Sequence, residues 1–240
     1  MSIAHPNDVI PAAATPRLRV QGGGSFPVRR IYCVGRNFAD HAREMGATAP
    51  ASKADRGTPV FFMKPADAIV TTPDVPYPLA TADLHHEVEL VVAVGADAPA
   101  GTLSVEQALD LVYGYTVGLD LTRRDLQAAA KAKGLPWDTA KGFDQSAPVG
   151  ELLPVAAAGP LQEQVLELEI NGQLRQRAPL SDLIWDVAEI LHELSKLYAL
   201  RAGDLVFMGT PAGVAALQPG DRFHARLEGI ASLHGQIKPA

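Results

Sequence analysis

The sequence predicts one mixed α+β domain that is rich in β-strand. Many short strand-like segments are separated by only a few segments with the periodicity of helices. No internal repeat and no clear linker divides the chain, and 240 residues suffice to bury one substantial core. We therefore expect residues 27–240 to form a single domain, preceded by a leader, residues 1–26, with one short strand at most.

The first part of this domain predicts strands joined by a short helix. Residues 28–34 form an apolar strand, after which Asn37 is placed to cap a helix over residues 38–45. Residues 47–58 contain Ala, Pro, Ser, Lys and Asp without periodicity, which predicts a mobile loop. Residues 60–63 are again apolar and predict a short strand.

The middle of the chain alternates between capped helices and strands. Ser104 and Gln107 form the pattern of a capping box, which predicts a helix that ends near Tyr113. Residues 115–119 then read as a strand that ends at Asp120.

The remaining elements follow from similar patterns. Thr122 and Asp125 predict the start of another helix by the same capping rule. Residues 165–170 alternate as a strand and are followed by Asn-Gly, a strong hairpin signal. The apolar residues between 187 and 198 recur at helical spacing and predict an amphipathic helix.

Residues 84–95 carry the pattern that is most informative about chemistry. Polar and apolar residues alternate before an apolar run, so the segment predicts a strand with Glu87 and Glu89 on one face and His85 behind them. Two neighbouring carboxylates repel each other, and a divalent cation between them removes the repulsion. Oxygen ligands suit Mg²⁺, Mn²⁺ or Ca²⁺. A solvated strand face is the alternative for the pair taken alone.

Composition narrows the class of protein. Hydrophobic residues make up 47% and charged residues 20%, as in ordinary soluble domains, and the net charge of −6 argues against a nucleic-acid partner. The one cysteine, Cys33, lies in an apolar run and fits a buried thiol in a reducing compartment. Without a signal-peptide pattern or an apolar stretch long enough to cross a bilayer, we expect a cytoplasmic protein with no membrane partner.

Four further residues are candidates for the same site. Asp120 follows a strand, where a rigid scaffold can present a functional group, although turn chemistry would look the same. His41 and Glu44 lie three apart on the short helix and could form an oriented general base, or a surface polar pair. Lys141 follows a partly apolar segment and is either a charge-stabilising group or a solvated lysine.

Six segments along the chain, taken together and in order, carry a family pattern. They are GRNFADHAREMG (35–46), PVFFMKPADAI (59–69), LHHEVELVVAVG (84–95), GYTVGLDLTRRDLQ (114–127), KGLPWDTAKGFDQSAPVG (133–150) and GDLVFMGTPAGV (203–214). From about residue 28 to about residue 232 the sequence thus resembles the fumarylacetoacetate hydrolase family, which implies a mixed β-sandwich roll, usually a homodimer.

The resemblance also implies roles for individual residues. Glu87, Glu89 and Asp120 match the ligands of one divalent cation, Mg²⁺ or Mn²⁺. His41 and Glu44 match a dyad that activates water, and Lys141 matches the lysine beside the metal. The positions implied in substrate binding are Arg36, Asn37, Lys64, Arg124, Gln127 and Thr210.

The implied activity is metal-dependent hydrolysis of a carbon–carbon bond in a 2,4-diketo acid, or acylpyruvate. Fumarylpyruvate, cleaved to fumarate and pyruvate in aromatic catabolism, is the expected substrate. An oxaloacetate decarboxylase, or an isomerase and decarboxylase acting on 2-hydroxyhepta-2,4-diene-1,7-dioate, is the alternative enzyme. A keto-acid-binding protein without activity would be marked by loss of His41, Glu44 or Lys141, and all three are present.

Overall fold

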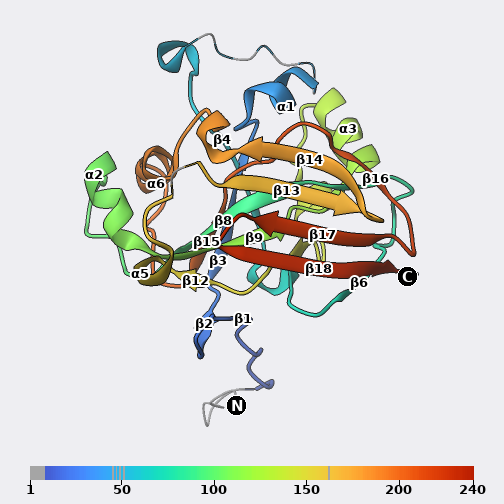
Figure 1. Cartoon of the computed structure of the whole chain (residues 1–240), viewed down its shortest axis with the longest axis horizontal. Coiled ribbons are helices and arrows are strands. Elements are labelled where there is room, and N and C mark those ends of the chain that lie inside the picture. Colours follow the sequence, from blue (N-terminus) through green and yellow to red (C-terminus); the bar gives the residue numbers. More distant parts are fainter. Residues whose placement is uncertain (1–8, 45, 47, 49, 51, 162) are drawn as a thin grey trace.

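The centre of the molecule is a six-stranded mixed sheet, seen in a computed structural model that describes residues 9–44, 46, 48, 50, 52–161 and 163–240. Its strands pair in the order β12-β9-β8-β15-β3-β4 (Figure 1). The strand bounds are β3 Arg30–Gly35, β4 Val60–Lys64, β8 Val88–Val94, β9 Val112–Leu119, β12 Leu153–Pro154 and β15 Asp204–Phe207.

A five-stranded sheet in the order β14-β13-β17-β18-β6 covers one side of this centre (Figure 1). Its longer strands alternate between buried and exposed residues, because only one face packs against the core. The bounds are β6 Asp74–Pro76, β13 Val165–Ile170, β14 Gln173–Pro179, β17 Arg222–Leu227 and β18 Ala231–Lys238.

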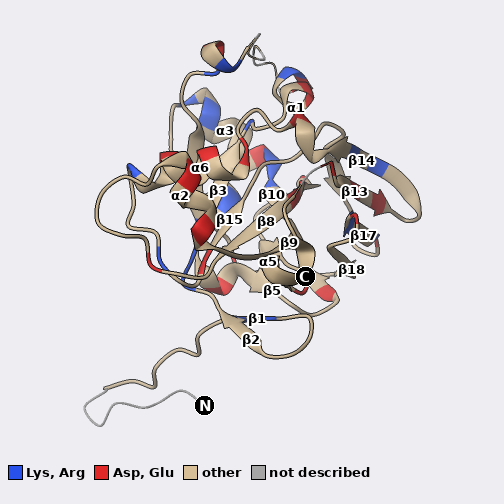
Figure 2. Ribbon diagram, turned by 60° about the vertical axis from the view of Figure 1, so that its left-hand side comes forward, with Lys and Arg blue, Asp and Glu red and all other residues tan. Residues whose placement is uncertain are grey.

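Shorter strands and helices complete the described chain (Figure 2). The three small sheets pair β10-β7-β16, β11-β5 and β1-β2, with bounds β1 Arg17–Arg19, β2 Ser25–Pro27, β5 Ile69–Val70, β7 Leu84–His86, β10 Thr122–Arg123, β11 Ala147–Pro148 and β16 Ala215–Leu217. The α-helices are α1 Ala39–Glu44, α2 Val105–Ala108, α3 Arg124–Ala132, α4 Asp138–Lys141, α5 Val155–Ala158 and α6 Val187–Ser195, and short 3₁₀ turns occur at Lys53–Asp55, Ala66–Ala68, Leu109–Leu111 and Leu180–Asp182.

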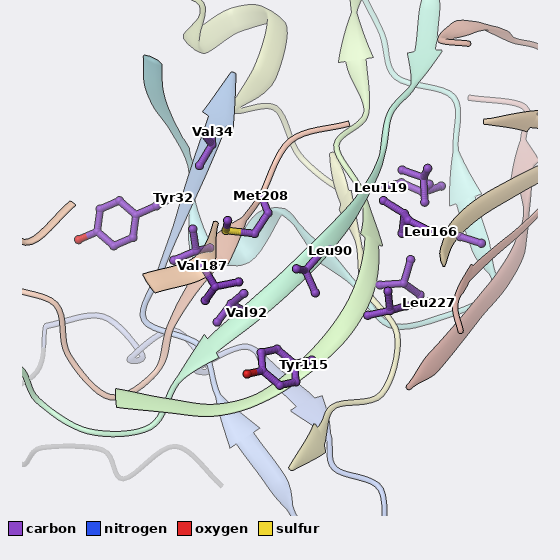
Figure 3. Close-up of a cluster of buried hydrophobic side chains, with 14 of the residues drawn as sticks. Tyr32, Val34, Leu90, Val92, Tyr115, Leu119, Leu166, Val187, Met208 and Leu227 are labelled. Carbon is purple, nitrogen blue, oxygen red and sulfur yellow. The ribbon is translucent and has the colours of Figure 1, made fainter. Parts of the chain in front are cut away.

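The main core lies between the two large sheets. Leu90 and Leu119 of the central sheet face Leu166 and Leu227 of the five-stranded sheet in one buried cluster (Figure 3). Burying each of these side chains contributes about 1.5–3 kcal/mol. This face-to-face packing confirms the predicted mixed β-sandwich roll.

Beyond Glu89, strand β8 is apolar without interruption because both of its faces are covered. Leu90 and Val92 belong to the main core, whereas Val91 and Ala93 belong to a second cluster on the opposite face. This burial on two sides explains why alternation along the segment gives way to a continuous apolar run.

The predicted strand over residues 84–95 is divided at Glu87. Strand β7 pairs with β10 and β16, whereas β8 pairs with β9 and β15, so Glu87 lies where the chain passes from the small sheet to the central one. Asp120 occupies the same position between β9 and β10, and its N–H donates to the Glu87 carbonyl over 2.8 Å. The crossing of two sheets therefore places both acids side by side.

The leader is more ordered than predicted within its described part. It contributes two strands, β1 and β2, in place of one at most. Leu18 and Phe26 are buried in the second core cluster together with Cys33, which confirms that this thiol is enclosed. Burial raises the pKa of Cys33 well above its ordinary value.

Local capping predictions had mixed outcomes. The Ser104–Gln107 capping box is present, although its helix is short and β9 begins at Val112, ahead of the expected end. Asn171 adopts a φ of 53° and joins β13 to β14, which confirms the hairpin. The cap predicted at Thr122 is wrong, because its hydroxyl bonds the Asp120 carbonyl and Lys141 instead.

The helix and loop predicted around residues 38–58 are only partly described. Helix α1 covers residues 39–44, and its expected last residue, Met45, lies outside the described residues. In the following segment, Arg56 pairs with Glu189 over 2.7 Å and lies 3.8 Å above the Trp185 ring, so this end of the predicted loop is anchored. The longest described helices have nine residues, and none of the described helices has the length and apolarity needed to cross a membrane.

Candidate active site

Three buried carboxylates converge where β8 meets β9. One oxygen from each of Glu87, Glu89 and Asp120 lies within 4.8 Å of the others. Their residues are at most 5% exposed. The common direction of Glu87 and Glu89, predicted from strand alternation, is thus observed, and Asp120 joins them from the neighbouring strand.

Lys141 neutralises part of this acidic cluster. Its ammonium lies 2.7 Å from Glu87 Oε2, 2.6 Å from Asp120 Oδ2 and 2.7 Å from the Thr122 hydroxyl. Helix α4 ends at this lysine, which is 2% exposed. Burial alone would lower the pKa of Lys141, but the carboxylates of Asp120 and Glu87 raise it above the ordinary value, so the lysine stays charged.

The two glutamates respond to the same surroundings in opposite directions. Burial opposes ionisation of Glu87, yet Lys141 and Arg124 lower its pKa below the ordinary range. Burial, together with the negative charges of Asp120 and Glu87, raises the pKa of Glu89 well above its ordinary value. The positive charges of the protein alone therefore do not compensate the carboxylate of Glu89.

The donor set fits a divalent cation. Asp120 Oδ1 is buried and accepts no hydrogen bond from the described residues, and it forms an ion pair with the Lys64 ammonium 2.8 Å away. A buried carboxylate oxygen without a hydrogen-bond donor, beside two further carboxylates, is the kind of ligand that Mg²⁺ and Mn²⁺ prefer. Glu87, Glu89 and Asp120 would hold such an ion.

A glycine brings a fourth segment against the cluster. The N–H of Gly209 donates to Glu89 Oε2 over 2.7 Å. Gly209 has a φ of 94°, and an added Cβ would lie 2.8 Å from the Cβ of Asn37. Only glycine suits both this conformation and this close approach, so the segment after β15 can fix Glu89.

His41 and Glu44 form the expected pair on α1. His41 Nδ1 lies 3.2 Å from Glu44 Oε2, and the Glu44 carboxylate also accepts the N–H of Gly213 over 3.1 Å. His41 is 6% exposed, and burial lowers the pKa of its imidazole, which favours the neutral form. With Nδ1 directed at Glu44, Nε2 is the ring nitrogen left to accept a proton.

Arg124 and Gln127 lie on the side of the cluster formed by α3. The Arg124 guanidinium contacts Glu87 and donates to Gln127 Oε1 over 2.5 Å and to His85 Nδ1 over 3.3 Å. His85 therefore supports the arginine that contacts Glu87. Both α3 residues line the same narrow pocket as His41 and Lys141.

Thr210 is positioned by a buried glutamine from the five-stranded sheet. Gln176 Nε2 donates to the Thr210 hydroxyl and to the Pro211 carbonyl, both over 2.8 Å. Gln176 Oε1 accepts the N–H of Val88 over 3.1 Å and contacts His86 Nδ1 over 2.9 Å. Because the threonine oxygen accepts from Gln176, its own proton is free to point into the pocket.

Two residues expected to contact substrate have other contacts. Asn37 is fully buried and holds the backbone of Trp185 and Met208 with its amide group. Lys64 is 1% exposed and lies behind Asp120, where it donates to the Leu121 carbonyl over 3.1 Å. The structure therefore places Asn37 and Lys64 as supports of the site, whereas Arg36 and Thr210 do line the pocket.

Several contributors were not predicted from the sequence. Gln176 gave no signal, because a lone polar residue in a hairpin strand does not reveal what it contacts across the core. Lys131 also lines the pocket, and its helical spacing from Gln127 could have identified it. Thr122 was interpreted as a cap, although its hydroxyl contacts Lys141.

Comparisons with known proteins agree with this geometry. The family model "Fumarylacetoacetate (FAA) hydrolase C-terminal" matches residues 30–238. A fumarylpyruvate hydrolase from Ralstonia sp is 40% identical over 191 residues, which cover 80% of this chain and 98% of the relative. An oxaloacetate tautomerase from Escherichia coli (strain K12) is 39% identical over 209 residues, 85% of this chain and 90% of the relative. The crystal structure of fumarylpyruvate hydrolase from Pseudomonas aeruginosa in complex with Mn²⁺ and pyruvate has a TM-score of 0.92 and 42% identity, covering 98% of this chain and 100% of that one.

Proposed function

Because the chain belongs to the fumarylacetoacetate hydrolase family, we propose that it hydrolyses a carbon–carbon bond in acylpyruvates. The favoured substrate is fumarylpyruvate, which yields fumarate and pyruvate in the catabolism of aromatic compounds. The observation that carries the proposal is one pocket lined by Glu87, Glu89, Lys141 and His41. The relatives named fumarylpyruvate hydrolase support the choice of substrate.

The residues of the pocket divide the reaction between them. When bound, Mg²⁺ or Mn²⁺ supplies a Lewis acid for the keto-acid end of the substrate. Glu44 holds His41 so that the neutral imidazole takes a proton from water, and the resulting hydroxide attacks the distal carbonyl carbon. The carbon–carbon bond then breaks, and its electron pair passes to the pyruvate fragment as an enolate.

Charge and proton are accounted for by the same groups. The Lys141 ammonium, 2.7 Å from Glu87, supplies positive charge next to the developing enolate. The proton that His41 took from water then passes to the enolate carbon and gives pyruvate, while the attacked carbonyl leaves as a carboxylic acid. The Thr210 hydroxyl, fixed by Gln176, donates to the substrate carboxylate.

A second candidate, action on oxaloacetate, is favoured by the relative from Escherichia coli that is named oxaloacetate tautomerase. Both activities need an enolate at the keto-acid end, but only hydrolysis needs activated water. The pairing of His41 with Glu44 therefore favours hydrolysis as the main activity.

The test is a comparison of wild type and His41→Ala on two substrates after EDTA treatment and restoration of Mg²⁺ or Mn²⁺. Wild type should hydrolyse fumarylpyruvate only with the metal restored. Loss of a general base should slow hydrolysis about 10²–10⁴-fold, with a much smaller effect on oxaloacetate decarboxylation. Equal loss of both activities with metal binding intact would contradict the role of His41.

We also propose a single catalytic domain over residues 27–240, a homodimer and a cytoplasmic location. The family match over residues 30–238 supports the domain, and the enclosed free thiol of Cys33 supports the location. The dimer is what the family resemblance of the sequence implies. Light scattering coupled to gel filtration would test the dimer.

A further inference from the structure

The active-site pocket has a second cationic end that the catalytic residues leave unexplained. Arg124, Gln127 and Lys131 are spaced by three and four residues along α3, so they share one face of the helix. All three line the pocket. Arg124 contacts Glu87, whereas Lys131 lies seven residues later, roughly 10 Å farther along the helix axis.

The positive charges at this far end form no ion pair with an acidic residue in the described part of the chain. Lys131 is partly buried, and its ammonium lies 5.1 Å from the centre of the Trp137 ring, without a carboxylate contact among the described residues. Arg36 follows β3, lines the same pocket and likewise pairs with no described acid. Burial and the guanidiniums of Arg124 and Arg36 lower the pKa of Lys131. An anion bound here would offset this unfavourable environment.

Aromatic rings lie between the two charged ends, because the Phe62 ring is 4.9 Å from the Lys141 ammonium and the Trp137 ring is 5.1 Å from the Lys131 ammonium. Val34, Phe62 and Trp137 line the pocket, and the rings of Phe62 and Trp137 pack with their centroids 5.9 Å apart. The pocket therefore offers a metal-binding end, an apolar middle and a cationic outer end. A ligand that matches all three has a keto acid at one end, a flat hydrocarbon segment and a second carboxylate.

We propose that Lys131, together with Arg36, binds the distal carboxylate of the substrate and so selects acylpyruvates that are dicarboxylic acids. This inference rests on the proposed function and defines its substrate class. Arg36 was expected to bind substrate, and Lys131 supplies the second cation. Acyl groups that end in a methyl would leave both cations without a counter-charge.

The test compares fumarylpyruvate with acetylpyruvate in wild type, Lys131→Met and Lys131→Arg. Removing the charge should raise the KM for fumarylpyruvate at least tenfold, the effect of about one lost charge-assisted hydrogen bond, with a much smaller change for acetylpyruvate. Lys131→Arg should retain most of the affinity. Lys133→Met, at an exposed position just after α3, is the matched control and should resemble wild type.

Product inhibition gives a readout that does not depend on turnover of the second substrate. Fumarate should inhibit wild type more strongly than crotonate, in which a methyl replaces one carboxylate, and Lys131→Met should remove this difference. An unchanged KM for fumarylpyruvate in Lys131→Met, or equal losses on both substrates, would overturn the carboxylate site and leave the proposed function intact. Wild type that hydrolyses neither acylpyruvate would overturn both.

Discussion

Lys141→Met should destabilise the metal-free protein and at the same time increase its response to metal. The ammonium bonds Glu87, Asp120 and Thr122 at 2.6–2.7 Å in a region closed to solvent. Methionine keeps much of the volume of the side chain but removes its charge. Among the described residues, the acids would then retain only the ion pairs with Lys64 and Arg124.

The size of the effect follows from the cost of leaving buried carboxylates unpaired. Removing one partner of a buried ion pair costs about 3–5 kcal/mol. In a chain of this length, 1 kcal/mol corresponds to about 2–4 °C in Tm, so the metal-free variant should melt on the order of 10 °C lower. A divalent cation replaces the lost charge, so the variant should gain more from added metal than wild type does.

Differential scanning fluorimetry after EDTA treatment, with and without MnCl₂, measures both quantities. Lys133→Met serves as the control, because the exposed lysine has no partner in this cluster. An unchanged Tm in the metal-free variant would refute the view that Lys141 compensates the acids. An equal gain from Mn²⁺ in the variant and in wild type would refute the shared location of lysine and metal.

The remaining predictions concern a residue that orients Thr210, an ion pair that anchors a loop, and the protonation of His41. Gln176→Leu should lower kcat/KM about tenfold, mainly through KM, because Thr210 loses its orienting donor; a variant with unchanged KM would contradict this. Arg56→Ala should remove about 1 kcal/mol at pH 7, or about 2–4 °C in Tm. Chiefly through its hydrogen bond, the Arg56 guanidinium lowers the pKa of Glu189 to about 2, so the difference between the two proteins in thermal melts should stay constant down to about pH 5 and shrink as the pH falls from there toward 2. Because burial lowers the pKa of His41, kcat/KM should decline only below about pH 6.5, and a decline centred above that value would count against a neutral histidine base.

The sequence predicts the site better than its surroundings because local spacing defines much of it. Glu87 and Glu89 share a face by strand alternation, and His41 and Glu44 share one by helical spacing. The sequence places Asp120 at the end of a strand. Predicting its contact with Glu87 would require knowing how the chain passes between two sheets at this point.

Contacts across the core account for what the sequence did not predict. Gln176 reaches Thr210 from a strand 34 residues earlier, and no local pattern encodes that approach. The cap predicted at Asn37 is wrong, because α1 begins at Ala39 and the Asn37 amide instead holds the backbone of Trp185 and Met208, a role that depends on tertiary packing. Local propensity likewise suggested a cap at Thr122, where the charge of Lys141 decides the contact instead.

The most direct test of the account is a crystal of this protein grown with MnCl₂ and pyruvate, with diffraction recorded at the manganese absorption edge. We predict an anomalous peak between the carboxylates of Glu87, Glu89 and Asp120, with pyruvate beside it and within reach of Lys141. The absence of a peak among these three acids in a well-ordered crystal, or a peak confined to another part of the protein, would contradict the central claim.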